Sequence, residues 1–257
     1  MSVARKHLFL NYKGGTGKTS ISAAYGYYLA SAGKKVLMID LDAQAHLTTC
    51  LNQESIHKNK SLYSVLVKGE DIIGIITDTS LSTLKLVPSS ISLSAVEPPL
   101  FRMPLREFKL RQALKSVERD YDYIIIDSAP SIGLLSLNAI LASDEILIPL
   151  LADFLSFHGL KILMETLASI EKDFYFYLGK IHIFLNRYNS GYPICEESKE
   201  AVNKYYPAYS LKTYISESHD IIDASSLGKS IFELAPDSKA AREIRDLVRE
   251  VNEGETK

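Results

Sequence analysis

Short apolar runs alternate with longer segments of helical periodicity along this chain of 257 residues. Many of these runs are apolar at nearly every position, as in "YIIID" at 123–127, which is typical of strands covered by helices on both faces. The alternation predicts an α/β fold, with a mostly parallel twisted sheet built from βαβ units and helices on both faces. The predicted strands lie at 7–12, 35–40, 84–89, 123–127, 145–150, 180–186 and 211–215.

Helical periodicity fills the segments between these strands. The segment 52–82 is polar and weakly periodic, and we expect one or two helices in it. No repeat, low-complexity stretch or linker divides the chain, so we expect one domain over residues 1–257. No apolar stretch approaches the roughly 18 residues of a membrane-spanning helix, so we expect no integral membrane contact. The predicted helices lie at 18–32, 105–119, 133–143, 156–171, 195–205 and 237–252.

Charge and cysteine content exclude some classes of function. The net charge of −2 gives no global attraction to nucleic acid, so any such binding must come from a local basic patch. The two cysteines, Cys50 and Cys195, lack CxxC spacing. This argues against a zinc site or a disulfide framework and fits a reducing cytosol.

The stretch "NYKGGTGKTS", residues 11–20, is typical of a phosphate-binding loop between a strand and a helix. A Walker A loop reads G-x-x-x-x-G-K-[ST], but Tyr12 stands where its first glycine is expected. Glycines allow the backbone to approach an anion, and the following helix adds its N-terminal dipole. We expect Lys18 to bridge the β and γ phosphates and Thr19 to bind Mg²⁺. The predicted nucleotide-binding residues of the loop are Gly14, Gly15, Thr16, Gly17, Lys18, Thr19 and Ser20.

A second lysine, Lys13, stands at the entrance of the loop. Such a lysine is usually a solvated charge. On the outer lip of a loop that holds three phosphates, however, it is also positioned to reach the site of a second copy. It would then act as an arginine finger does in trans, neutralising charge that develops during phosphoryl transfer.

Three aspartates follow predicted strands, at the edge of the sheet where ligands of open α/β folds gather. Asp40 and Asp42 in "MIDLDAQ" are two residues apart, so both side chains can point into one cleft. We expect Asp42 to position the attacking water and Asp40 to lie near the metal. Asp127 closes an apolar strand, as does the Walker B aspartate that holds Mg²⁺. The alternative for Asp40 and Asp127 is a structural helix cap.

Together these segments resemble the ParA/MinD/Soj group of deviant Walker A ATPases, whose loop reads K-G-G-x-G-K-[ST]. The likeness extends through "YDYIIIDSAPSIGLLSLNAILASDEILIPL", "DFLSFHGL" and "ASSLGKSIFELAPDSKAAREI". Among the branches of this group, the chain most resembles the small ParA-type partition ATPases. The resemblance implies a P-loop NTPase fold and makes Lys13 the signature lysine that contacts nucleotide across an ATP-bound homodimer. Lys13, Lys18 and Asp42 are thereby the predicted catalytic residues.

The resemblance also implies partners. ATP-bound dimers would coat DNA without sequence preference, a ParB-like protein would stimulate hydrolysis, and the protein would be cytoplasmic and associated with the nucleoid. Asn186 stands where the family contacts adenine, with Arg187 beside it. Two positions depart from the family pattern: Ala43 replaces a proline, and Glu217 stands where a DNA-contacting arginine is common.

The helical segment 237–252 carries cations at three- and four-residue spacing over an apolar face. One basic stripe above a buried face suits phosphate binding. Interleaved acids at Glu243, Asp246 and Glu250 leave open a solvated helix laced with ion pairs. A second set, from Arg106 to Arg119, has the same ambiguity. The predicted DNA contacts are Lys229, Lys239, Arg242, Arg245 and Arg249.

Other functions share this loop. A MinD-like ATPase on a membrane surface would need an amphipathic basic tail, whereas this tail reads "VNEGETK". An iron protein of the nitrogenase type would need cysteines placed to hold a cluster. A metabolic ATP-dependent ligase would need further polar groups beside the γ-phosphate, and no cluster beyond Asp40 and Asp42 is evident in the sequence.

Overall fold

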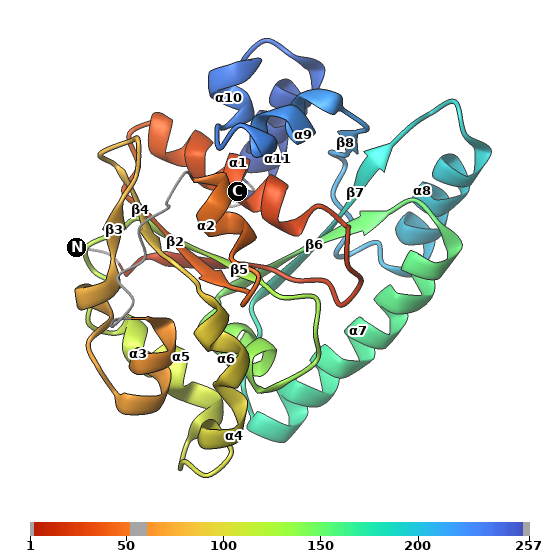
Figure 1. The fold of residues 1–257 in the computed structure, drawn as a ribbon. Coiled ribbons are helices and arrows are strands. Elements are labelled where there is room, and N and C mark those ends of the chain that lie inside the picture. The colour runs from red at the N-terminus through yellow and green to blue at the C-terminus, as the bar shows by residue number, and fades with distance from the viewer. Residues whose placement is uncertain (1–2, 52–60, 254–257) are drawn as a thin grey trace.

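The computed structural model describes residues 3–51 and 61–253 and shows a sheet between two layers of helices (Figure 1). Within these residues eight strands lie in the order β3-β4-β2-β5-β1-β6-β7-β8. All neighbours are parallel except β3 and β4, which are antiparallel. The predicted α/β fold is confirmed. The strands are β1 (Arg5–Phe9), β2 (Val36–Leu41), β3 (Thr77–Asp78), β4 (Leu84–Val87), β5 (Tyr123–Ser128), β6 (Glu145–Leu151), β7 (Lys180–Tyr188) and β8 (Ile215–Ser216).

Two groups of helices cover opposite faces of the sheet, as Figure 1 shows. One face packs against α1 (Lys18–Ser31), α2 (His46–Cys50), α9 (His219–Ser226), α10 (Ile231–Leu234) and α11 (Lys239–Glu253). The other packs against α3 (Leu62–Lys68), α4 (Glu97–Leu100), α5 (Lys109–Leu114), α6 (Leu134–Ala142), α7 (Phe154–Phe174) and α8 (Pro193–Tyr205). Short 3₁₀ helices are η1 (Ile72–Ile75), η2 (Ile91–Ala95) and η3 (Arg106–Phe108).

Successive strand residues enter different cores, which explains their uninterrupted apolar sequence. In β5, Ile124 and Ile126 join the core that contains α6 and α7, whereas Ile125 joins the core that contains α1 and α11. All three are fully buried. Burying one such side chain contributes about 1.5–3 kcal/mol relative to exposure, so both faces of each central strand stabilise the sheet.

Some predicted boundaries were wrong. The strand expected at 211–215 is only β8, because the backbone N–H groups of Lys212 and Thr213 donate to the Glu250 carboxylate of α11 at 2.7 and 2.8 Å and not to a strand. The helix expected at 105–119 is η3 followed by the shorter α5. The strand expected at 7–12 is β1, which ends at Phe9. Of 52–82, residues 52–60 lie outside the described residues, and the rest forms α3, η1 and the unpredicted edge strand β3.

The strand order brings the predicted site residues to one edge of the sheet. Parallel pairing sets Phe9, the last residue of β1, beside Asp127 of β5. It also sets Asp40 of β2 beside Asp127 on the other side. The loop after β1 therefore opens next to both carboxylates, in the crevice at the carboxyl ends of the strands where α/β sheets bind ligands.

Candidate functional site

The loop between β1 and α1 has an open, glycine-dependent backbone. Gly15 and Gly17 have φ angles of +74° and +88°, in the left-handed region that favours glycine. A Cβ added at Gly14 or Gly15 would meet nothing within 4 Å, whereas one at Gly17 would lie 2.1 Å from the Asn186 side-chain nitrogen. Helix α1 begins at Lys18 without a side-chain cap, so its first N–H groups are available to an anion.

Two polar side chains of this loop are buried. The Thr16 hydroxyl has no hydrogen-bond partner among the described residues, and Lys18 is only 6% exposed. The Lys18 ammonium donates to the Lys13 carbonyl oxygen at 3.4 Å. Burial lowers the pKa of Lys18, against the attraction of Asp127 and Asp42. An unpartnered donor and a desolvated cation at a glycine loop fit a phosphate group, which would supply acceptors and negative charge.

Thr19 and Asp127 meet directly. The Thr19 hydroxyl donates to one Asp127 oxygen at 2.7 Å, while the other oxygen is buried without a partner. Burial, and then the neighbouring Asp40 charge, raises the pKa of Asp127 to about 7. No group of three or more His, Cys, Asp or Glu side chains among the described residues is arranged to hold a metal. The oxygen donors present fit Mg²⁺, which keeps waters and takes phosphate oxygens as further ligands.

Asp40 and Asp42 have different surroundings. Asp40 is fully buried, and its oxygens accept from the Thr48 N–H at 2.8 Å, the Thr48 hydroxyl at 2.7 Å and the Asp42 N–H at 3.1 Å. Burial raises the pKa of Asp40 to about 6 against these hydrogen bonds. Asp42 is half-buried and accepts from the Gln44 N–H at 2.9 Å. Asp40 thus fixes the turn that carries Asp42. This structural role is additional to the predicted position near the metal.

Lys13 lies against its own chain. Its ammonium donates to both Asp153 oxygens, at 3.0 and 2.9 Å, and to the Ser156 hydroxyl at 2.9 Å. Asp153 is also the N-cap of α7 and accepts from the Ser156 N–H at 2.7 Å. Burial alone would raise the pKa of Asp153, but the hydrogen bonds from Lys13 and Ser156 outweigh it and lower that pKa. This pair was not predicted from the sequence, although aspartate before an apolar helical pattern is a recognisable N-cap signal.

A cavity of about 90 Å³ adjoins the loop. Gly17, Ser20 and Ile21 of the loop and α1 line it, together with Asn186 and Arg187 of β7. Further lining comes from the segment after β8, which includes Glu217 and Ile222. The structure therefore brings the two residues predicted to contact adenine next to the phosphate loop. It also puts Glu217, which we associated with a DNA surface, beside this cavity.

The predicted DNA residues on α11 are exposed or half-buried but largely engaged within the chain. Lys239 and Arg249 each approach a carboxylate of their own helix at 3.6 Å, and Arg242 and Arg245 donate to backbone oxygens. Glu243 and Glu250, in contrast, accept from the backbone at β8 and just before it. The apolar side is buried as expected. Lys229, in the turn after α9, is exposed.

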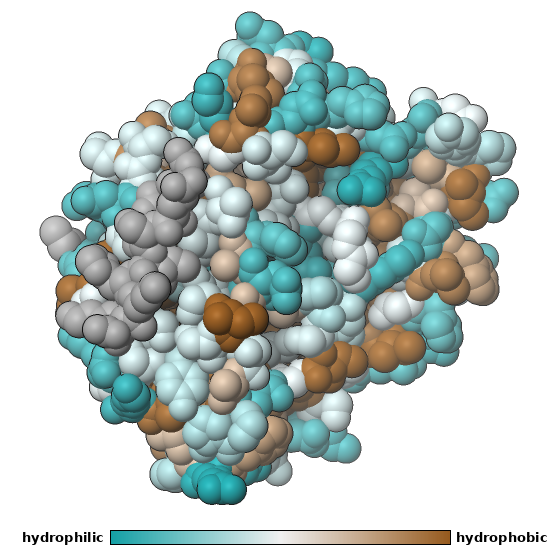
Figure 2. All heavy atoms as spheres, viewed as in Figure 1, coloured by the Kyte–Doolittle hydropathy of each residue, from teal (hydrophilic) through white to brown (hydrophobic). Residues whose placement is uncertain are grey.

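Apolar side chains are exposed on the same edge of the sheet as the loop. Ile132 follows β5, and Phe154 and Leu155 follow β6; they are 66%, 77% and 70% exposed. Figure 2 shows separate hydrophobic areas among the polar ones on the face that it presents. Across the described part of the chain, we find no helix with the length and apolar character needed to cross a membrane.

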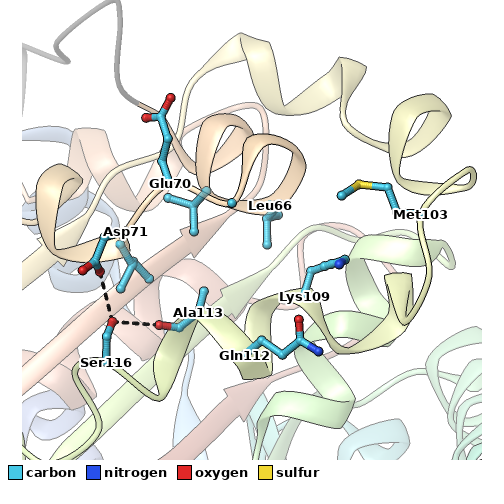
Figure 3. Close-up of a pocket in the computed structure, with 11 residues that line it drawn as sticks. Leu66, Glu70, Asp71, Met103, Lys109, Gln112, Ala113 and Ser116 are labelled. Carbon is cyan, nitrogen blue, oxygen red and sulfur yellow. Dashed lines mark hydrogen bonds between the residues drawn. The ribbon is translucent and has the colours of Figure 1, made fainter.

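A larger cleft, of about 360 Å³, lies away from the phosphate loop between α3 and α5 (Figure 3). Leu66, Glu70, Met103 and Lys109 are among its lining residues. The Ser116 hydroxyl donates to Asp71 at 3.1 Å and ties the two sides together. No residue of the loop or of the carboxylate cluster lines this cleft, so its size does not make it the reaction site.

The glycine loop, the buried Lys18 and the Thr19–Asp127 contact define a P-loop nucleotide-binding protein, and Lys13 marks it as the deviant Walker A class. A family model described as an AAA domain matches residues 4–179. The chain belongs to this family and, within it, to the ParA/MinD group of partition ATPases.

Individual relatives match most of the chain. It is 45% identical over 244 residues to the cell division protein PomZ of Myxococcus xanthus, covering 95% of this chain and 76% of PomZ. It is 37% identical over 245 residues to the sporulation initiation inhibitor protein Soj of Bacillus subtilis, covering 94% and 95%. A solved ATP complex of a McdA variant from Cyanothece superposes with a TM-score of 0.88 at 25% identity, covering 97% of this chain and 96% of that one.

Proposed function

We propose that this chain is a dimerising ATPase that binds DNA non-specifically in its ATP state and partitions or positions plasmid, chromosome or other cargo. A ParB-like partner stimulates its hydrolysis, which is slow alone, and it acts as one domain on the nucleoid in the cytoplasm. The observation that carries the proposal is the pair of lysines on one loop: Lys18 is buried and attracted by Asp127, whereas the half-buried Lys13 ammonium is held by the side chains of Asp153 and Ser156.

In this proposal the loop backbone and Lys18 hold the phosphates of ATP. The Thr19 hydroxyl and, through water, Asp127 would hold Mg²⁺, with Asp40 near it, and the bound ion would supply positive charge against the phosphates. Asp42 orients the attacking water, and Asp40 fixes the turn on which Asp42 stands. Asn186 and Arg187 border the base. Hydrolysis is slow alone because Lys13 must come from a second protomer.

Dimerisation through this edge of the sheet is supported by the exposed Ile132, Phe154 and Leu155, which flank the loop. Large apolar side chains exposed near a binding site can mark a surface that another protein covers. If ATP is held between the phosphate loops of two protomers, this edge of the sheet is covered only when ATP is bound. ATP binding and dimerisation would then be coupled.

DNA binding would use Lys229 and the basic residues of α11. Their intrachain contacts are mostly surface ion pairs and backbone contacts, and surface ion pairs are worth only about 0–1 kcal/mol each. Phosphates can therefore displace them at small cost. Dimerisation would double the patch, which raises affinity steeply because each phosphate contact multiplies it.

The test is binding of the Asp42→Ala variant to arbitrary duplex DNA with Mg²⁺–ATP or Mg²⁺–ADP at two salt concentrations. We expect binding with ATP only, weakening steeply with salt because counterions are released. Lys18→Ala is the control that should lose the ATP effect. ATP-driven dimers that ignore DNA would instead favour a MinD-like membrane ATPase. No ATP-driven dimer at all would favour a metabolic ligase.

A further inference from the structure

The cavity beside the phosphate loop presents hydrogen-bond acceptors to a base. The Asn186 side-chain N–H₂ donates to the Thr16 carbonyl oxygen at 2.8 Å, and Asn186 is only 4% exposed. This buried hydrogen bond assigns the orientation of the amide and leaves its oxygen as the group free to contact a ligand. Ile21, Ile221 and Ile222 supply apolar lining suited to the faces of a flat ring.

Glu217 adds a second acceptor on the rim. It lines the same cavity, its side chain is exposed, and no hydrogen bond or ion pair to its carboxylate is found within residues 3–51 and 61–253. Its backbone, in contrast, is fixed. The Glu217 N–H donates to the Tyr188 carbonyl oxygen at 3.2 Å, and the adjacent Ser216 donates its N–H and its hydroxyl to Glu243, both at 2.7 Å.

The free carboxylate of Glu217 and the amide oxygen of Asn186 thus line one cavity, and among the described residues no donor to either acceptor is found. The exocyclic amino group of adenine carries two N–H donors and matches such a pair. The 6-oxo group of guanine or hypoxanthine would direct an acceptor at acceptors, which costs affinity because the desolvated oxygens stay unpaired.

We propose that Glu217 is a specificity residue that accepts a hydrogen bond from the 6-amino group of adenine and excludes 6-oxo purine nucleotides. This inference rests on the proposed nucleotide site and adds to it a residue that departs from the family pattern. Glu217 thus serves the base and not a DNA surface.

The experiment measures equilibrium dissociation constants, with Mg²⁺, for ATP, inosine triphosphate, 2′-deoxy-ATP and purine riboside triphosphate, which lacks the amino group. The proteins are wild type, Glu217→Ala, Glu217→Gln and Lys18→Ala. Glu200→Ala, at an exposed position of α8, is the matched control, because it removes the same charge away from the cavity. The Glu217 side chain has no hydrogen bond or ion pair within the described part of the chain to lose, so its variants should fold.

We expect Glu217→Ala to weaken ATP and 2′-deoxy-ATP about tenfold and leave purine riboside triphosphate unchanged, as loss of one charge-assisted hydrogen bond requires. Glu217→Gln, which gains a donor, should bind inosine triphosphate more tightly than wild type does. Glu200→Ala should match wild type.

Equal weakening of ATP and purine riboside triphosphate in Glu217→Ala, or no weakening of either, overturns the role in base recognition. If Glu217→Ala weakens the binding of ATP but not of 2′-deoxy-ATP, the carboxylate contacts the ribose 2′-hydroxyl. That result also overturns the role in base recognition. If wild type binds no triphosphate, or Lys18→Ala binds as well as wild type, the proposed phosphate site itself fails. These results separate failure of the inference from failure of the proposed function.

Discussion

Replacing Asp153 with asparagine should strengthen nucleotide-dependent dimerisation. Asp153 holds the Lys13 ammonium within its own chain, so each protomer must break this contact before Lys13 can reach a partner's nucleotide. Asparagine removes the charge and keeps a good N-cap for α7, because its side-chain oxygen can still accept from the Ser156 N–H. The substitution therefore isolates the ion pair from helix capping.

The expected magnitude follows from the exposure of the pair. The Lys13 and Asp153 side chains are 35% and 40% exposed, with the ammonium 2.9 Å from the carboxylate oxygen. Solvent screening limits such a pair to about 0.2–1 kcal/mol. Because a dimer releases two pairs, the gain is about 0.4–2 kcal/mol, or roughly a 2- to 30-fold tighter dimer.

Sedimentation velocity with Mg²⁺ and a non-hydrolysable ATP analogue measures the dimer dissociation constant directly. The gain of Asp153→Asn over wild type should shrink at high salt, because the lost interaction is between partly exposed charges. Asp153→Ala is the comparison that also removes the cap. A dimer that is weaker in Asp153→Asn than in wild type would show that the Lys13–Asp153 contact supports assembly and does not oppose it.

Two further predictions concern stability. Gly17→Ala should destabilise the fold by about 1–3 kcal/mol in urea unfolding, since the φ of Gly17 is +88° and a Cβ would lie 2.1 Å from Asn186. Gly14→Ala is the control and should change the stability little, because a Cβ there meets nothing within 4 Å. Equal losses of stability in the two variants would contradict this reasoning. Burial lowers the pKa of His7 below its ordinary value of 6.5, although Glu145 acts to raise it. Protonating His7 is therefore less favourable in the folded state than in the unfolded state, and the fold loses stability as the pH falls below 6.5. Between pH 7.5 and 5.5, wild type should therefore lose stability relative to His7→Gln, by at most about 1.4 kcal/mol per pH unit; parallel unfolding curves would refute the assignment.

The central strands and the loop were predictable because their signals are local. An apolar run closing on Asp127, or glycines between a strand and a helix, depends on neighbours within ten residues. The shortened helix α5 was not predictable in this way. Leu105 adopts a left-handed φ of +51° just before η3, which no residue pattern around it signals.

The contacts of the site residues depended on strand order. Asp40 was expected near the metal, with a structural helix cap as the alternative; which partners its oxygens have, Thr48 of α2 and the Asp42 N–H, came only from the structure. Glu243 and Glu250 left open a solvated helix laced with ion pairs, and the structure shows that they hold the backbone of residues 212–216. Thr48 and the backbone of residues 212–216 lie on other elements than the carboxylates they contact. The spacing of residues along one strand or helix does not show which residues of another element will be near.

The sequence by itself determined that this chain forms a parallel α/β sheet with a two-lysine phosphate loop, because periodicity, glycine spacing and strand-end carboxylates are properties of adjacent residues. Only the tertiary structure decided that Lys13 contacts Asp153, 140 residues away, and that Glu217 lines the cavity beside Gly17. Hydrogen bonds and ion pairs form between whichever groups the fold brings within about 3 Å, and that proximity is set by the order of the strands.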